Sequence, residues 1–445
     1  MNSLRERMER GPYQAYAYAY PHKTAYRDLQ TPVVLKELWA GEDRSALFAY
    51  LHIPFCTYRC GFCNLFALGQ PASDLVERYV AQLILQMAIV GDALGAHRFA
   101  RFAIGGGTPS YLSAEQLVRV FEAATRNFTV DLQAIPAGIE VSPETATLDR
   151  LQVCRQAGID RVSMGVQSFV DSELKSLARP THSRQVVEAV GIVRELGFPT
   201  LNLDLIYGIP GQSRESLEAS VRAVLSFQPE ELYLYPLYVR PGTGLGKRGA
   251  RREQPRQRDD TRQLLYRAAR ELLLEAGYTQ VSMRMFRSPS APESSGPAYC
   301  CQNDGMVGVG CGARSYTRTL HYSDHYGVER ASVTSILQQY VSAPESSFAH
   351  AHYGFQLDAS EQRRRYVIQS LLVFPGLDEP AYAARFGTAL SADFPRLDDL
   401  IACGLARRTD GLLALTTEGI AHADTIGPWL SSDDVVARME SHAVA

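Results

Sequence analysis

The stretch His52-Ile-Pro-Phe-Cys56-Thr-Tyr-Arg-Cys60-Gly-Phe-Cys63 contains three cysteines with the spacing C-x3-C-x2-C. Three thiolates on one short loop can bind three irons of a [4Fe–4S] cube, and the fourth iron is then left without a cysteine. An iron without a protein ligand can bind a substrate or a cofactor directly. The spacing therefore predicts a cluster that takes part in chemistry, rather than one that only carries electrons.

Two other roles of clustered cysteines fit this sequence less well. A structural zinc site needs four ligands, usually in two close pairs, and no Cys or His occurs in the dozen residues after Cys63. His52 is near, but Pro54 is expected to hold the strand exit rigid and direct it elsewhere. A disulfide pair is typical of secreted proteins, and residues 1–12 contain no charged-then-apolar leader.

The composition is that of a globular protein with room for two or three domains. The chain has 445 residues, 46% of them hydrophobic and 21% charged, with a net charge of −3. This charge gives no field that would attract nucleic acid, and the apolar runs are too short to span a membrane. Eight cysteines are too few and too unevenly placed for a disulfide scaffold. Reduced thiols and an oxygen-sensitive cluster both indicate the cytoplasm.

Apolar strands alternate with amphipathic helices from Ala46 to Met283. This alternation predicts right-handed crossovers and a parallel α/β sheet, with the cysteine loop at the carboxyl end of the first strand. The pattern does not separate an open sheet from a closed or partial barrel. The expected strands are 47–52, 101–104, 138–141, 161–166, 200–207 and 231–237. The expected helices are 74–94, 113–125, 147–157, 183–196 and 213–227, with capping signals at Asp74, Ser113 and Asp260.

The tail differs from this pattern. Helices are expected at 361–372, 379–386 and 396–403, followed by two strands, 404–408 and 412–416, around Asp410-Gly411, which indicates a winged-helix-like domain. We expect a lid or docking role rather than DNA binding. The predicted organisation is an N-terminal arm at 1–45 that wraps the barrel, a core at 46–320, a linker at 321–360 and the tail domain at 361–445. The tyrosine-rich segment 12–26 is either an arm over a cavity mouth or, as we prefer, a wrapper on the core.

Polar residues interrupt the apolar strands at several points. Glu140, Gln167 and Asp204 lie in successive predicted strands, and buried charges are costly unless they are paired or bind a ligand. On neighbouring strands they would face one cavity, where Arg179 could bind a carboxylate with both nitrogens. The run Gly105-Gly106-Gly107-Thr108-Pro109 follows the second strand, and its backbone can approach a ligand closely. Together these residues indicate a polar cofactor beside the cysteine loop.

Several motifs occur in a fixed order, and together they resemble one family. They are Tyr50-x-His52-x-Pro54-Phe55-Cys56-x3-Cys60-x2-Cys63, Gly105-Gly-Gly-Thr-Pro109, Ile139-Glu-Val141, Arg161-Val-Ser-Met-Gly-Val-Gln167-Ser-Phe169 and Asp204-Leu-Ile-Tyr-Gly-Ile-Pro-Gly-Gln212. Over roughly Phe48 to Ser315 the chain is similar to the oxygen-independent coproporphyrinogen III oxidase family of radical S-adenosylmethionine (SAM) proteins. The resemblance implies a partial (β/α)6 barrel of the TIM type, and a winged-helix tail fits it as well.

The resemblance also implies the cofactors and their contacts. The cofactors would be a [4Fe–4S] cluster with SAM on its open iron, and in some members a second SAM. The second site would involve Cys301-Gln302-Asn303-Asp304 and Gly308–Ser315, which could instead be a Gly-rich strand and turn that closes the barrel. The cluster ligands would be Cys56, Cys60 and Cys63, which are also the catalytic residues. The expected cofactor contacts are Tyr50, Phe62, Gly106, Gly107, Thr108, Glu140, Gln167, Arg179, Asp204 and Gln302.

The chain departs from the family at three positions. Leu65 stands where decarboxylating members have a further cysteine. Gln302 replaces the histidine that haem-chaperone relatives offer to haem iron. Arg314 stands where relatives tend to have a smaller or apolar residue, and it could bind a substrate carboxylate. Cys300, Cys301 and Cys311 have no cluster spacing, and we expect separate thiols.

Three functions remain open at this stage. The first is a radical SAM enzyme that forms a 5′-deoxyadenosyl radical and modifies a small molecule, with a second SAM, by C-methylation or related carbon–carbon bond formation. The second is oxidative decarboxylation of a porphyrinogen, which would make the protein an oxidoreductase, and Leu65 counts against it. The third is a haem carrier without enzymatic activity, and Gln302 counts against it. We expect a monomer that receives electrons from a donor such as flavodoxin or ferredoxin and acts on neither membrane nor nucleic acid.

Overall fold

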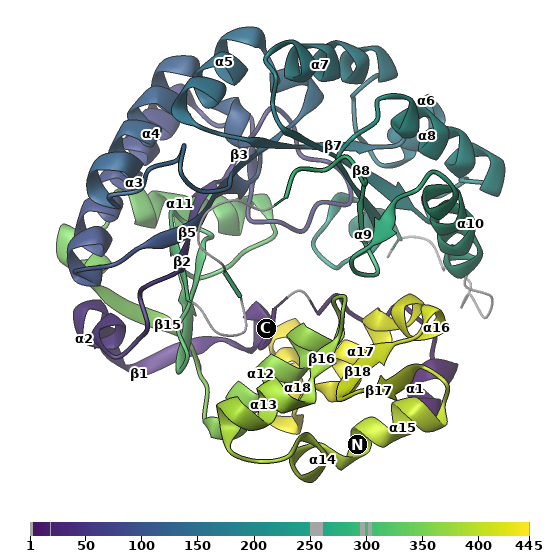
Figure 1. Ribbon diagram of the computed structural model, residues 1–445. Helices are drawn as coiled ribbons and strands as arrows, with labels where there is room; N and C mark the ends of the chain where they lie inside the picture. The colour runs from purple at the N-terminus through teal and green to yellow at the C-terminus, as the bar shows by residue number, and fades with distance from the viewer. Residues whose placement is uncertain (1–2, 18, 250–260, 294–298, 301–304, 445) are drawn as a thin grey trace.

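The computed structural model describes residues 3–17, 19–249, 261–293, 299–300 and 305–444. Its largest feature is a sheet of 13 strands in the order β1-β15-β14-β13-β12-β2-β5-β6-β7-β8-β9-β11-β10. The strands from β12 to β9 run parallel to one another. Figure 1 shows the sheet as an open arc with helices along its outer rim and the tail domain below its open side. The predicted partial barrel is confirmed.

Six strands of the arc are each followed by a helix. The strands are β2 (Leu47–Ile53), β5 (Phe99–Gly106), β6 (Ala137–Val141), β7 (Arg161–Gln167), β8 (Thr200–Tyr207) and β9 (Glu231–Pro236). The helices are α3 (Ser73–Leu94), α4 (Ala114–Asn127), α5 (Leu148–Ala157), α7 (Ser183–Glu195), α8 (Arg214–Ser226) and α10 (Arg262–Glu275). Short helices α6 (Asp171–Ser176) and α9 (Gly244–Gly249) lie in the connections. All the strands and helices expected in this region are present, with ends shifted by up to two residues.

The two faces of the arc differ in polarity because side chains alternate along each strand. In β7, Val162 and Met164 are fully buried in the apolar layer shared with the helices, whereas Arg161 and Ser163 face the other way and are half-buried. Glu140 in β6 is solvent-accessible although protein surrounds it on all sides. The space inside the arc, which we call the lumen, is therefore open to solvent at Glu140.

Antiparallel strands extend the arc at both edges. On one side the last parallel strand is β12 (Met306–Val309). Beyond it lie β13 (Arg314–Tyr316), β14 (Leu320–Ser323), β15 (His350–Gln356) and β1 (Arg27–Val34), and on the other side lie β11 (Met285–Arg287) and β10 (Thr279–Gln280). The range 321–360, expected to be a linker, instead contributes β15 and the helix α11 (Arg330–Val341) to this part of the fold. Residues 308–315 form a Gly-containing strand and turn, which agrees with the structural alternative considered for them.

The tail consists of helices packed around a small sheet, and its hydrophobic core is separate from that of the arc. Its helices are α12 (Ala359–Leu371), α13 (Glu379–Phe386), α14 (Leu390–Asp393), α15 (Asp398–Ala402), α16 (Thr417–Ala421), α17 (Ala423–Leu430) and α18 (Asp433–Val444), and its strands are β16 (Leu377–Asp378), β17 (Ala406–Thr409) and β18 (Leu412–Leu415). The β17–β18 hairpin confirms the predicted wing. The helix expected at 396–403 is present but shorter, because its first two residues belong to a 3-10 turn (Pro395–Leu397) and α15 covers Asp398–Ala402.

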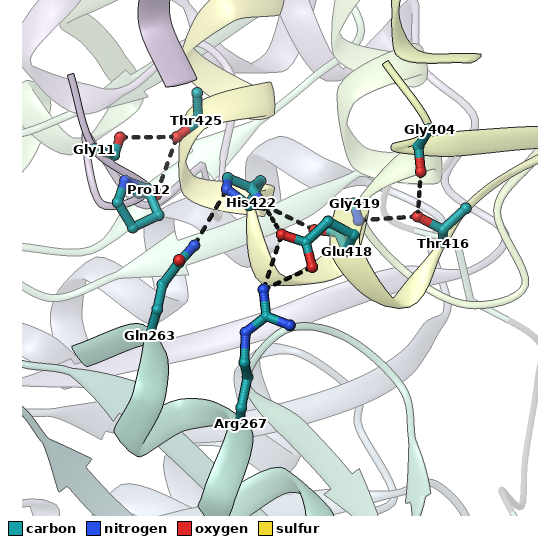
Figure 2. A network of polar contacts seen from close by, with 10 residues as sticks. All are labelled: Gly11, Pro12, Gln263, Arg267, Gly404, Thr416, Glu418, Gly419, His422 and Thr425. Carbon is teal, nitrogen blue, oxygen red and sulfur yellow. Dashed lines mark hydrogen bonds and ion pairs between the residues drawn. The ribbon is translucent and has the colours of Figure 1, made fainter. Parts of the chain in front are cut away.

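The N-terminal segment lies between the arc and the tail. Helix α1 (Leu4–Glu9) packs on α17, and the backbone N–H groups of Gln14 and Ala15 donate to the Asp424 carbonyl. Thr425 donates to the carbonyls of Gly11 and Pro12 in the same network (Figure 2).

Helix α10 of the arc also bonds the tail directly. Arg267 pairs with Glu418 at 2.7 Å, and Gln263 lies 3.1 Å from His422 between their side-chain nitrogens (Figure 2). The arc, the tail and the N-terminal segment therefore meet at one interface.

Helix caps test the local predictions. The Ser113 capping box is present, with the Gln116 backbone donating to the Ser113 hydroxyl and the Gln116 side chain accepting from the Ser113 backbone. The Asp74 cap is wrong, because α3 begins one residue earlier and Ala72 occupies the cap position. Asp260 lies outside the described residues. No helix of the described ranges is long and apolar enough to cross a membrane.

Candidate functional site

The three cysteines lie on the loop that leaves β2 at its carboxyl end. Cys56 ends the short strand β3 (Phe55–Cys56), which pairs with β4 (Leu68–Gly69) and closes the loop. The three thiols are not joined by a disulfide, are half-buried and lie close enough to influence one another electrostatically. Burial raises the pKa of the Cys56 thiol to about 12. Burial also raises the pKa of Cys60, against the opposing charge of Arg179. Binding to iron would therefore drive proton release.

The donor set fits a cluster better than a single metal ion. Among the described residues, no three His, Cys, Asp or Glu side chains converge on one position that could hold one ion. A zinc site requires such convergence, whereas each thiolate of a cluster binds its own iron at a separate corner. The three cysteines on this single loop can hold three corners of a [4Fe–4S] cube.

The glycine run lies against the first cysteine. Thr108 Oγ1 donates to Cys56 Sγ at 3.5 Å, and the Thr108 backbone N–H donates to the Phe55 carbonyl at 2.8 Å. A Cβ at Gly107 would lie 2.9 Å from Cys56 Sγ and 2.7 Å from the Phe55 carbonyl oxygen, so a side chain is excluded there. Gly106 has a positive φ of 121°, which favours glycine. The run therefore brings bare backbone to the edge of the cysteine loop.

Arg179 connects the second cysteine to the sheet. Its Nη1 donates to Cys60 Sγ at 3.2 Å and its Nη2 donates to the Gly165 carbonyl at 2.5 Å. Its Nε is buried and has no hydrogen-bond partner among the described residues. A buried donor without an acceptor is costly. This nitrogen is therefore available to an acceptor that arrives with a ligand, such as a carboxylate.

Two carboxylates lie on the concave face beyond the cysteines. Glu140 accepts from the Gly106 backbone N–H at 2.9 Å, which joins β6 to the glycine run. Asp204 in β8 accepts from Asn202 Nδ2 at 2.7 Å. Burial raises the pKa of both carboxyls, that of Asp204 to about 7, against opposing hydrogen bonds from Gly106 and Asn202 respectively.

The remaining expected residues take different positions around the lumen. Gln167 ends β7 with a positive φ of 73°, and its amide nitrogen lies over Gly165. Tyr50 shares the concave face with His52, with 3.3 Å between its hydroxyl and His52 Nδ1. Phe62 packs with an apolar cluster at the ends of β8 and β9, where it anchors the loop. Gln302 lies outside the described residues.

Sequence reasoning missed several polar groups of this face. Arg161 pairs with Glu231 at 2.7 Å across the intervening strand β8. Asn202 also donates to Ser163 Oγ at 2.7 Å, while its own Oδ1 is buried without a partner among the described residues. The alternation Arg161-x-Ser163-x-Gly165-x-Gln167 places all four residues on one face and could have identified this surface.

A second missed contact holds the cysteine loop. Tyr58, between the first two cysteines, donates to Glu144 Oε2 at 3.2 Å and bonds the Thr181 hydroxyl. No spacing rule identifies such a contact, because its partners lie 86 and 123 residues away.

Comparisons with known proteins agree with this geometry. The radical SAM superfamily is matched by residues 50–224 and the HemN C-terminal domain by residues 357–422. The chain is 31% identical to the haem chaperone HemW of Escherichia coli over 274 residues, which is 60% of this chain and 69% of that protein. It is 28% identical to the oxygen-independent coproporphyrinogen III oxidase of Bradyrhizobium diazoefficiens over 433 residues, which is 93% and 92% of the two chains.

A solved structure shows the same fold. The coproporphyrinogen III oxidase HemN of Escherichia coli superimposes with a TM-score of 0.80 at 22% identity, over 94% of this chain and 97% of that one. The cysteine loop, the glycine run and the polar concave face thus occur within a shared architecture. The chain therefore belongs to the radical SAM superfamily, in its oxygen-independent coproporphyrinogen III oxidase-like branch, and its cofactors are a [4Fe–4S] cluster and SAM.

Proposed function

We propose that this protein is an enzyme that binds SAM across the concave face and removes a hydrogen atom from a carboxylated tetrapyrrole held in the lumen. The observation that carries this proposal is the accessible polar lumen beside three cysteines, with Glu140, Arg179 and Asp204 on its wall. The named activities of the relatives, which concern coproporphyrinogen and haem, supply the substrate class. The electron comes from an external carrier such as a flavodoxin or ferredoxin.

Each residue has a separate part in this scheme. Cys56, Cys60 and Cys63 hold the cluster, and Gly106 and Gly107 offer backbone groups to the amino end of SAM. Arg179 binds the SAM carboxylate, whereas Asp204 and Gln167 bind its ribose hydroxyls. When bound, the reduced cluster and SAM supply abstraction of a hydrogen atom from an unactivated carbon. The surrounding barrel orients that carbon and excludes water.

The lumen favours an enzyme over a haem carrier. A carrier needs an axial ligand for haem iron, and both ring nitrogens of His52, which precedes the cysteine loop on β2, already have hydrogen-bonding contacts within the protein. Its Nε2 lies 3.1 Å from the Phe66 carbonyl oxygen and its Nδ1 lies 3.3 Å from the Tyr50 hydroxyl. C-methylation with a second SAM, expected from the sequence, has no support in the described contacts, and we keep it as an alternative outcome of the test below.

Binding of SAM is expected to depend on pH through Asp204. The pKa of this carboxyl is about 7 in the free protein because burial disfavours its charge. Ribose hydroxyls would donate to the ionised form and stabilise it. Affinity should therefore rise as pH increases through 7 and level off above it, with a loss of up to about tenfold per pH unit below. Anaerobic equilibrium dialysis at pH 6, 7 and 8 measures this, and Asp204→Asn should flatten the profile. The same slope in the variant would exclude this role.

The test of function is anaerobic turnover with methyl-labelled SAM and coproporphyrinogen III. We expect 5′-deoxyadenosine in proportion to the coproporphyrinogen consumed, with the label confined to methionine. Label in the product would establish methylation instead. Stoichiometric haem binding without any cleavage of SAM would show a carrier and refute the enzyme.

A further inference from the structure

A cavity of about 230 Å³ lies outside the lumen, beside the antiparallel strands that extend the arc. Helices α3 and α11 pack against each other on one side of it, and α2 (Leu35–Ala40) and the 3-10 turn η4 (Glu345–Ala349) contribute to the same wall. Strands β12 to β15 supply the rest of the wall. None of the residues that would hold the cluster or SAM in the proposed function lines this cavity.

Asp324, directly after β14, supplies the one carboxylate among the described residues of this wall. It is partly accessible, and its carboxylate has no hydrogen bond or ion pair within the described part of the chain. Burial raises the pKa of this carboxyl to about 6, against the charge of His325. His325 is itself paired with Asp28, with 3.2 Å between its Nε2 and Asp28 Oδ1. No described Lys or Arg lines the cavity, so a cation that entered it would meet an uncompensated negative charge.

Aromatic side chains form much of the same wall. Those that line the cavity are Tyr322, Tyr340, Phe348 and Tyr353. The ring centroids of Tyr340 and Phe348 are 5.6 Å apart. The Tyr340 hydroxyl donates to Gln86 Oε1 at 2.8 Å, and that oxygen also accepts from the Gly310 backbone N–H at 2.7 Å. These bonds satisfy polar groups of the wall, whereas the aromatic faces attract organic cations.

The turn between β12 and β13 lies between this cavity and His52 on β2. Cys311 lines the cavity, whereas a Cβ at the next residue, Gly312, would lie 2.9 Å from His52 Nε2. Tyr79 makes a second connection, since its hydroxyl donates to the His52 carbonyl at 2.7 Å and its ring centroid lies 5.1 Å from that of Tyr340. This turn therefore has the cavity on one side and the histidine of the concave face on the other.

We propose that this cavity binds a small organic ammonium compound, with Asp324 as the counter-ion and the aromatic rings against its apolar part. An ammonium group suits the site because it donates to a carboxylate and is attracted by aromatic faces. A metal ion suits it less, because no three His, Cys, Asp or Glu side chains of the described ranges converge on one position. The volume limits the ligand to a small one, since sites for drug-sized ligands measure about 300–1,000 Å³. This inference is independent of the proposed function.

The test measures binding of benzylamine to the full-length reconstituted protein at pH 8 by anaerobic calorimetry, with benzyl alcohol as the uncharged probe. Benzylamine should bind at a single site, and its affinity should fall about 10- to 100-fold in Asp324→Asn, because this change removes a charged hydrogen-bond acceptor. The affinity for benzyl alcohol should change little. The matched control Glu345→Gln alters an exposed carboxylate of η4 that does not line the cavity, and it should leave both affinities unchanged.

A second variant tests the place of binding. Ala343→Leu would fill part of the cavity from its wall and should weaken the binding of both probes. If benzylamine did not bind, or bound the unmodified and Asp324→Asn proteins equally well, the proposal would be overturned. A loss of affinity in Asp204→Asn but not in Asp324→Asn would place the amine in the lumen, and displacement of benzylamine by SAM would assign the cavity to a second SAM. Either result would also refute the proposed site.

Discussion

Replacing Cys60 with Ala should reduce both the broad iron–sulfur absorption and the formation of 5′-deoxyadenosine to the level of protein without a cluster. Cys60 would hold one of three irons, and a cube with two remaining thiolates is poorly retained. The change also removes the sulfur that accepts from Arg179 Nη1 at 3.2 Å, so a buried guanidinium loses an acceptor. Iron and sulfide content after anaerobic reconstitution and product yield with dithionite measure the two effects.

The control for this variant is Cys403→Ala. Cys403 is another half-buried free thiol, but it follows α15 in the tail. Its replacement should leave iron content and product yield unchanged. If the Cys60→Ala protein formed as much 5′-deoxyadenosine as the unmodified protein, the cysteine loop would not hold the cluster that cleaves SAM.

Replacing Asp424 with Asn should lower the free energy of unfolding by about 3–5 kcal/mol. The Asp424 carboxylate accepts from Arg284 Nη2 and from the Tyr238 hydroxyl, each at 2.5 Å. The side chains of the pair are only 4% and 2% exposed. Burial lowers the pKa of Arg284, but the Asp424 carboxylate more than offsets this and raises it. Without that carboxylate a buried positive charge would lose its partner where the arc meets the tail.

An exposed ion pair of the same interface provides the control. Arg267 and Glu418, whose contact is drawn in Figure 2, have side chains that are 45% and 42% exposed. Glu418→Gln should therefore change stability by about 0–1 kcal/mol. Urea unfolding followed by circular dichroism measures both variants. A loss below about 1 kcal/mol for Asp424→Asn would mean that the buried pair is not what joins the two parts.

The arc could be predicted well because its signals are local. The strand expected at 200–207 has the same ends as β8, because an apolar run bounded by turns leaves little choice of where a strand begins and ends. The hairpin at Asp410-Gly411 was also predictable, since both residues adopt the positive φ that such a turn needs. Glu140, Gln167 and Asp204 could be identified as polar residues that interrupt apolar strands, although the partners of Glu140 and Asp204 could not.

The parts that sequence reasoning missed depend on distant pairing. Strand β1 pairs with β15 through Arg27 and Gly354, 327 positions apart, and through Val34 and His350, 316 positions apart. No local pattern therefore marks 321–360 as part of the sheet. Lys23 and Tyr326 are likewise brought together only by the fold. The Asp74 cap failed because Ser73 already begins the helix, a choice of one residue that packing decides.

The most direct test concerns the iron that the three cysteines leave open. Mössbauer spectroscopy of the isotopically enriched cluster, with and without SAM, compares its four iron sites. We expect four irons with tetrahedral sulfur-rich coordination before SAM is added, and a distinct shift of a single iron to higher coordination afterwards. Spectra unchanged by saturating SAM, or iron replaced by zinc in protein purified without oxygen, would contradict it.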